Sequence, residues 1–345
     1  EGYGLDLENY TDPGFEETGS GVTWIYREDG TAWTSQGGDL TGSSLSYYFE
    51  NGYEDTELEV TQWVEDWIAG TYPDQGIRIN MSNSYEDGSQ SRSFYTKKFF
   101  ARNSEFFYKR PCIEARWDSS TRDDRGRIYV TSSLLSNADN TNRLYFYHNF
   151  NGTLKNINTN PALKVRFYSD SAYTNEIVPN YTSSVVSSSG IYYIETRLVT
   201  TASTGYDKWF ISSSSEPIWS SSFEVNRRSY DTSNFEKKHV TNITNLRNKY
   251  YNTETARFNL YVREHDWQPT VYIVSNNTIE NTTLHELYYK ITRTEDKNII
   301  IDYSTGSVGY TRASYDLSGS YFDLDMSIFE KDSTYLINLA RWDGT

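Results

Sequence analysis

The chain has 345 residues, and its 47 acidic and 32 basic residues give a formal net charge of −15. This charge argues against a protein that follows a nucleic-acid backbone and against simple attraction to anionic lipid. No stretch approaches the roughly 18 apolar residues that a membrane helix requires, so we expect a soluble chain that binds neither nucleic acid nor membrane. The length favours two or three domains.

Aromatic residues dominate the apolar composition. The chain has 31 Tyr, 9 Trp and 16 Phe, in short segments separated by Ser, Thr, Asn and Gly, beside four His and one Cys. Such residues suit a pleated, half-buried surface, so the composition predicts many short strands. The single Cys112 cannot form an internal disulfide, and we expect it to be a buried apolar residue.

The clearest helical pattern lies near Thr61 to Gly70, with Thr61 as the expected cap and Gly70 as the stop. Its apolar side chains share one stripe, which we expect to dock on a sheet: Trp63, Val64, Trp67 and Ile68. A second helix is predicted at residues 241–251, where Asn and Thr lower the helix propensity.

Period-two alternation predicts strands at several places along the chain. These are residues 92–101, 112–117, 143–148, 163–168 and 256–263. Turn residues separate such segments, as at Asn151 and Gly152, Ser189 and Gly190, and residues 317–319.

Composition divides the chain into three parts, residues 1–118, 119–225 and 226–345. Residues 119–126 are polar and carry both charge signs, which is typical of a linker between domains. We find no repeat of fixed period, and this argues against a solenoid or propeller.

The first part resembles DNRLRE-type domains, which are themselves similar to carbohydrate-binding jelly rolls of cell-surface and secreted proteins. The matching motifs occur in the order typical of that family: GVTW at 21–24, WTSQGGD at 33–39, LEVTQWVEDWIAG at 58–70, QGIRI at 75–79, FFARNSE at 99–105 and RPCIEAR at 110–116. The resemblance implies a jelly roll over residues 1–118, with the helix closing one end. It also implies strands before the Thr-Trp motif, and we expect this sequence to lack them.

Longer stretches resemble a structural protein of marine tailed bacteriophages. They are YTKKFFAR at 95–102, residues 110–117, KNI at 155–157, FNLYVREHDW at 258–267 with PTVYI at 269–273, and SYDLSGSYFDLDMS at 314–327. This resemblance implies a virion component, assembled in the host cytoplasm, whose partners are other virion proteins and copies of itself. A final strand after residues 335–341 is usual in such proteins, so we expect the last domain to lack it.

The expected architecture is therefore all-β. A jelly roll at 1–118 would precede two immunoglobulin-like sandwiches at 119–225 and 226–345, with one short helix near Thr61 to Gly70. Strand edges of such sandwiches favour assembly with neighbouring chains.

Motifs for catalysis are sparse. The sequence has no Gly-x-Ser-x-Gly elbow, and its four His are far apart, which argues against a catalytic triad or a transition-metal site. Acidic pairs occur at Glu16 and Glu17, Glu65 and Asp66, Asp123 and Asp124, and Asp323 and Asp325, and a glycoside hydrolase is the third hypothesis. We expect no enzyme and no cofactor, with structural Ca²⁺ near Asp12, Asp39 or Asp87 as a minor option.

The candidate contact residues for a glycan or a partner are Trp24, Trp33, Trp219 and Trp267. An exposed indole suits the apolar face of a sugar, whereas burial between sheets is the competing explanation. The alternative function is therefore an adhesin for host-surface glycans or polysaccharides, located at an extracellular surface.

Overall fold

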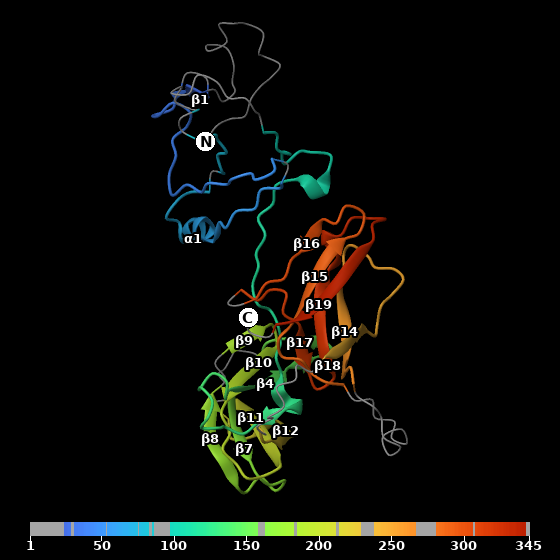
Figure 1. Ribbon diagram of the computed structural model, residues 1–345. Helices are drawn as coiled ribbons and strands as arrows, with labels where there is room; N and C mark the ends of the chain where they lie inside the picture. Colours follow the sequence, from blue (N-terminus) through green and yellow to red (C-terminus); the bar gives the residue numbers. More distant parts are fainter. Residues whose placement is uncertain are drawn as a thin grey trace. The chain divides into compact units, whose positions relative to one another are not determined.

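The computed structural model describes residues 24–28, 31–52, 54–74, 76–82, 85, 97–157, 163–182, 185–211, 214–228, 238–266, 281–305 and 308–342. The chain forms two compact units, Glu1–Lys98 and Phe99–Thr345 (Figure 1). The regular structure of the described residues consists mostly of strands in several sheets, so the predicted all-β class is confirmed.

In the first unit, strand β1 (Tyr26–Glu28) pairs antiparallel with β2 (Thr31–Ala32). The described residues of this unit also contain helix α1 (Thr61–Ala69), which confirms the predicted helix. Gly70 ends it in the left-handed conformation, with φ of 72°, a conformation that glycine adopts without steric cost.

Two details of the predicted helix are wrong. Val60 occupies the cap position, and Thr61 is the first helical residue, whose N–H donates to a Glu59 carboxylate oxygen at 3.0 Å. No residue of α1 is buried, and the Ile68 side chain is 82% exposed. The apolar stripe is therefore not docked as a whole on any described sheet.

The second unit contains the other strands and three short 3₁₀ helices. In chain order these are η3 (Phe107–Lys109), η4 (Asp124–Gly126), β3 (Ile128–Tyr129), β4 (Asn142–Tyr147), β5 (Asn149–Phe150), β6 (Thr153–Leu154), β7 (Leu163–Tyr168), β8 (Glu176–Thr182), β9 (Val185–Ser188), β10 (Ile191–Thr196), β11 (Thr204–Ile211), β12 (Pro217–Asn226), β13 (His239–Ile243), β14 (Thr255–Glu264), β15 (Leu287–Arg293), β16 (Ile299–Ile301), β17 (Ser314–Asp316), β18 (Gly319–Asp325), η5 (Met326–Ile328) and β19 (Tyr335–Arg341).

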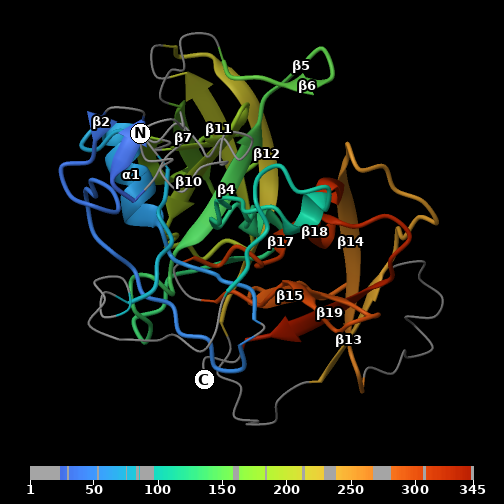
Figure 2. The ribbon, with the colours of Figure 1, turned by 90° about the horizontal axis from the view of Figure 1, so that it is seen from above.

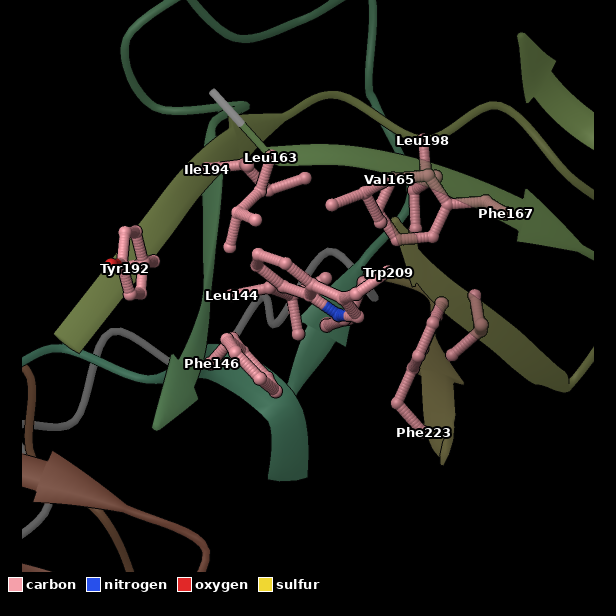
Figure 3. Packing of buried hydrophobic residues seen from close by; sticks show 12 residues of the cluster. Leu144, Phe146, Leu163, Val165, Phe167, Tyr192, Ile194, Leu198, Trp209 and Phe223 are labelled. Carbon is pink, nitrogen blue, oxygen red and sulfur yellow. The ribbon is translucent and has the colours of Figure 1, made fainter. Parts of the chain in front are cut away.

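The strands from β3 to β12 form the first sandwich of this unit. A sheet in the order β4–β10–β9 faces a sheet in the order β3–β12–β11–β7–β8, and β3 pairs parallel to β12. Side chains from both sheets meet in one core, and Figure 3 shows the Trp209 indole in the middle of this cluster. The fully buried members of the core include Leu144, Leu163, Val165 and Trp209.

Local sequence signals account for much of this sandwich. The alternating segments at 143–148 and 163–168 coincide with β4 and β7, as predicted. Asn151 and Gly152 have φ of 51° and 77°, which is the conformation of the tight turn that suits paired strands. They connect β5 and β6 in a hairpin that extends away from the sandwich (Figure 2).

The strands from β13 to β19 form the second sandwich. A sheet in the order β13–β14–β18–β17 faces a sheet in the order β16–β15–β19. Phe322 of β18 stacks on Phe258 of β14 at 5.2 Å and on Tyr289 of β15 at 4.5 Å between ring centroids. Stacked rings from both sheets therefore form the centre of this core.

Several sequence predictions differ from the structure in and next to the second unit. Part of the helix predicted at 241–251 is strand β13, because pairing with β14 outweighs a weak helix propensity. Residues 112–117 form no strand and are all exposed, Cys112 included, because no described sheet covers their alternating apolar side chains. Of the strand predicted at 92–101, residues 92–96 lie outside the described part, and residues 97–101 form no strand.

Gly205 of β11 lies directly beside a buried ring. A Cβ atom added there would be 2.3 Å from Phe223 Cε2, and Phe223 is only 4% exposed. We expect Gly205→Ala to lower the free energy of unfolding by about 1–3 kcal/mol through overpacking. Urea unfolding measures the loss, with the exposed Ser220→Ala on neighbouring β12 as the control. Equal stability of the two variants would contradict this packing.

Candidate functional site

The polar segment predicted as a linker is partly buried between the two sandwiches. Within residues 118–127, which we call the joint, Asp123, Asp124 and Arg125 are each no more than 9% exposed. Buried charges are tolerated when hydrogen bonds and opposite charges satisfy them. The joint is therefore held by specific contacts with both sandwiches.

Arg125 anchors the joint in the first sandwich. Its guanidinium donates to both carboxylate oxygens of Asp207, at 2.9 and 3.0 Å, and the Asp207 residue has no exposed surface. Trp209 Nε1 donates to the same carboxylate at 2.7 Å. The Trp219 ring lies 4.5 Å from the guanidinium carbon. A bidentate pair with a further donor and an aromatic face is a strongly directional anchor.

Backbone pairing anchors the joint in the second sandwich. The Asp123 N–H donates to the Tyr315 carbonyl at 3.0 Å, and the Tyr315 N–H donates to the Thr121 carbonyl at 2.8 Å. Tyr315 belongs to β17, which both views place at the boundary of the two sandwiches (Figures 1 and 2). The Tyr315 hydroxyl also donates to Asp124 Oδ1 at 2.8 Å. The joint thus extends the edge of this sheet.

A cavity of about 450 Å³ opens beside the joint, and both sandwiches contribute to its wall. The wall is mostly polar and is lined by Arg122, Asp124, Arg127, Tyr129, Ala138, Asp139, Thr141, Asn142, Arg143, Glu195, Arg228, His285, Glu286 and Tyr315.

A chain of hydrogen bonds crosses this cavity wall. The Tyr315 hydroxyl, bonded to Asp124, lies 2.9 Å from His285 Nδ1. Burial raises the pKa of Asp124, against the hydrogen bonds from the Arg143 N–H and the Tyr315 hydroxyl. Burial lowers the pKa of His285, so the neutral imidazole is favoured there. Perturbed groups beside a cavity mark it as the candidate site of the second unit.

The carboxylates of the second unit that the sequence singled out for glycoside hydrolysis are engaged by other protein groups. Asp124 accepts the Arg143 N–H and the Tyr315 hydroxyl, one on each oxygen, and Asp123 accepts the Arg125 N–H at 3.1 Å. Asp323 pairs with Arg257 on the surface.

The remaining acidic residues have other surroundings. Asp325 accepts the Ser327 N–H at the start of η5, and Glu65 is exposed on α1. Glu16 lies outside the described residues. The doublets of the second unit therefore contribute to a cap, a surface ion pair and the joint.

The aromatic candidates lie in different surroundings. Trp24, in the first unit, is 47% exposed, and Arg78 lies 5.5 Å from its ring, whereas Trp33 is half-buried. Trp219, in the second unit, is half-buried and packs on the first sandwich's core, with Arg125 on its ring. Trp267 lies outside the described residues.

The expected calcium loops are described only in part. The Asp39 carboxylate accepts the N–H groups of Thr34 and Ser35, at 3.1 and 2.8 Å, and these bonds lower its pKa. Asp12 and Asp87 lie outside the described residues. In the described ranges, no three His, Cys, Asp or Glu side chains gather as metal ligands. No helix in those ranges is long and apolar enough to span a membrane.

Sequence reasoning missed Asp207, the partner of Arg125 in the joint, and His285 and Tyr315 of the cavity wall. A signal for Asp207 was present, because it lies two residues before Trp209 and alternation places both on the core side of β11. A charged residue at a core position requires a buried partner. His285 and Tyr315 carried no comparable local signal, because their contacts depend on the joint.

No protein-family model, curated protein or solved structure matches this chain.

Proposed function

We propose that this chain is a non-enzymatic structural protein of a tailed-phage virion, which assembles with other virion proteins and with copies of itself. The observation that carries the proposal is the joint. Its buried charges hold two sandwiches in one fixed relation through a bidentate ion pair and a shared sheet edge. Directional buried contacts favour one geometry, and such rigidity suits a protein that holds neighbours at set distances.

The strand orders support the proposed architecture. In the first sandwich, β4–β10–β9 faces β3–β12–β11–β7–β8, and in the second, β13–β14–β18–β17 faces β16–β15–β19. We propose that both are immunoglobulin-like. When the strands of each sandwich are lettered in chain order, β4–β10–β9 corresponds to the B-E-D sheet of that fold and β13–β14–β18–β17 to its A-B-E-D sheet. Each of these sheets faces a sheet that contains the strands lettered C and F. The jelly roll proposed for residues 1–118 depends on the sequence resemblance.

Exposed strand edges offer surfaces for assembly. Strand β19 has seven residues and pairs with β15, and within the described ranges no strand pairs with its other edge. Its core-facing Ile337 and Leu339 are only partly buried. Because an edge strand presents backbone donors and acceptors, a strand from a neighbouring protein can extend this sheet.

Labelling of purified particles tests the virion assignment. An antibody raised against this chain, carried on gold and imaged on intact phage, is expected to decorate head, neck or tail at regular positions. Mass spectrometry of the same particles is expected to find peptides of the chain in constant ratio to the other virion proteins. Absence of both label and peptides from every particle would overturn the proposal.

The exposed Trp24 favours one second candidate function, a glycan-binding adhesin. Its indole is 47% exposed beside Arg78, and an aromatic face with a nearby donor suits a sugar. Binding on a glycan array that is abolished by Trp24→Ala, with an unchanged circular dichroism spectrum, would support it. Trp117→Ala is the matched control, since Trp117 is also exposed, at 65%. Equal binding by both variants would exclude Trp24 as the contact.

A further inference from the structure

Three arginines on the cavity wall have no carboxylate partner among the described residues. Arg122, Arg127 and Arg228 line the cavity, and they form no ion pair within the described ranges, although the whole chain carries 47 acidic and 32 basic residues. In so acidic a chain, a cluster of unpaired guanidinium groups at one cavity favours a negatively charged ligand there.

The acidic residues of the wall are already engaged. Glu195 pairs with Arg143 at 2.7 Å, and Glu286 pairs with Arg312 at 3.0 Å. Asp124 accepts two hydrogen bonds from the protein, and burial raises its pKa, which disfavours its charged form. The remaining acid, Asp139, accepts the Ser136 hydroxyl at 2.7 Å.

The positive charges therefore exceed the negative charges that are free to balance them. Of the four acidic residues on the wall, two are paired with other arginines and one is buried with its charged form disfavoured.

Protein contacts orient two of the three arginines and leave donors unused. Arg127 donates from Nε to the Tyr129 hydroxyl at 2.8 Å and from one terminal nitrogen to the Thr283 carbonyl at 3.0 Å. Arg228 donates to the Asp139 carbonyl at 2.7 Å, and its guanidinium carbon lies 4.8 Å from the Tyr129 ring. A guanidinium has five N–H donors, so each keeps several for a ligand.

Arg122 adds an unsatisfied donor at the same wall. Its Nε is buried and has no hydrogen-bond partner. The described protein groups therefore leave part of the hydrogen-bonding capacity of the Arg122 guanidinium unused. Arg122 and His285 both act on the Asp124 carboxyl, and Arg127 and Arg228 both act on His285. The three arginines and His285 are therefore electrostatically linked through Asp124 and His285.

We propose that this cavity is a binding site for a tetrahedral oxyanion, a phosphate or sulfate group, held by the guanidinium groups of Arg122, Arg127 and Arg228. Arginine suits this role because its planar fork donates two parallel hydrogen bonds to such a group. The volume of about 450 Å³ exceeds the need of a single ion and lies in the range of about 300–1,000 Å³ typical of small-molecule sites. A sugar that carries the anion fits as well as the free ion.

Calorimetric titration of the full chain tests this site. Inorganic phosphate and sulfate are titrated at constant ionic strength, with sodium chloride as the balancing salt, so that screening does not change. Saturable binding with one site is expected for both anions. Glucose 6-phosphate and glucose form the second arm. Tighter binding of glucose 6-phosphate than of phosphate identifies a sugar-borne group, and equal binding identifies the free ion.

Two variants and one control connect the binding to these arginines. Arg122→Gln and Arg228→Gln are each expected to weaken phosphate binding about tenfold or more, the effect of losing a charge-assisted hydrogen bond. Arg257→Gln removes an arginine that pairs with Asp323 on the surface and should bind as the original chain does. Arg228 is exposed, so its variant tests the site even if Arg122→Gln impairs folding. Absence of saturable binding, or equal binding by all variants, would overturn the proposal.

Discussion

Asp207→Asn is expected to lower the free energy of unfolding by about 3–5 kcal/mol, because it leaves the buried Arg125 guanidinium without its countercharge. Asp207 has no exposed surface and binds the guanidinium through both oxygens. An asparagine keeps the size and one acceptor, so the change removes mainly charge. Guanidinium chloride unfolding of the full chain measures the loss.

A second bidentate ion pair, exposed at the surface, supplies the control. Arg257 and Asp323 are also bidentate, at 2.8 and 2.9 Å, but their side chains are 53% and 43% exposed. Exposed pairs contribute about 0.2–1 kcal/mol, so Asp323→Asn should have a small effect. Equal losses in the two variants would show that burial does not decide the strength of the Arg125–Asp207 anchor.

Asp123→Asn is expected to stabilise the chain at pH 8 and to have little effect at pH 4. Burial raises the pKa of Asp123 from 3.8 to about 6, against the opposing charge of Arg125. The contribution of such a carboxyl to stability is fully present below its ordinary pKa of 3.8, where it is protonated in both the folded and the unfolded state. It is lost as the pH rises through the folded pKa of about 6. A shift of about two pKa units corresponds to roughly 3 kcal/mol.

Urea unfolding at intervals between pH 4 and pH 8 measures this dependence. The asparagine can still accept the Arg125 N–H, so the cap at η4 is kept while the charge is removed. Asp170→Asn is a control of opposite sign, because hydrogen bonds from Thr174 and Asn175 lower the pKa of this exposed carboxyl. It should be less stable than the original chain above about pH 4, and this difference should shrink as the pH falls below the ordinary pKa of 3.8. A gain for Asp123→Asn that does not change with pH would contradict the burial argument.

Local sequence patterns predicted the elements whose backbone conformation depends on neighbouring residues. Alternation at residues 163–168 and 256–263 predicted β7 and β14, and the Asn151–Gly152 pair predicted the turn of the β5–β6 hairpin. The apolar spacing and Gly70 predicted α1. In each case, the backbone conformation follows from neighbouring residues, through side-chain alternation, helical spacing or a tolerance for positive φ.

The same reasoning failed where distant partners decide the structure. Residues 112–117 alternate but have no described sheet to cover them, and residues 239–243 are a strand because β14 lies beside them. The joint is the clearest case. Its mixed charges are typical of an exposed linker, and only Asp207 and Tyr315, which lie 82 and 191 residues away from Arg125 and Asp124, explain their burial.

The sequence by itself determined the all-β class, because period-two patterning and turn residues are properties of neighbouring positions. Only the tertiary structure decided which charges are buried, that two sandwiches share one joint, and that His285, Tyr315 and three arginines line one cavity. These features depend on contacts between segments far apart in the chain. Their energies come from burial and directional pairing, which no local pattern encodes.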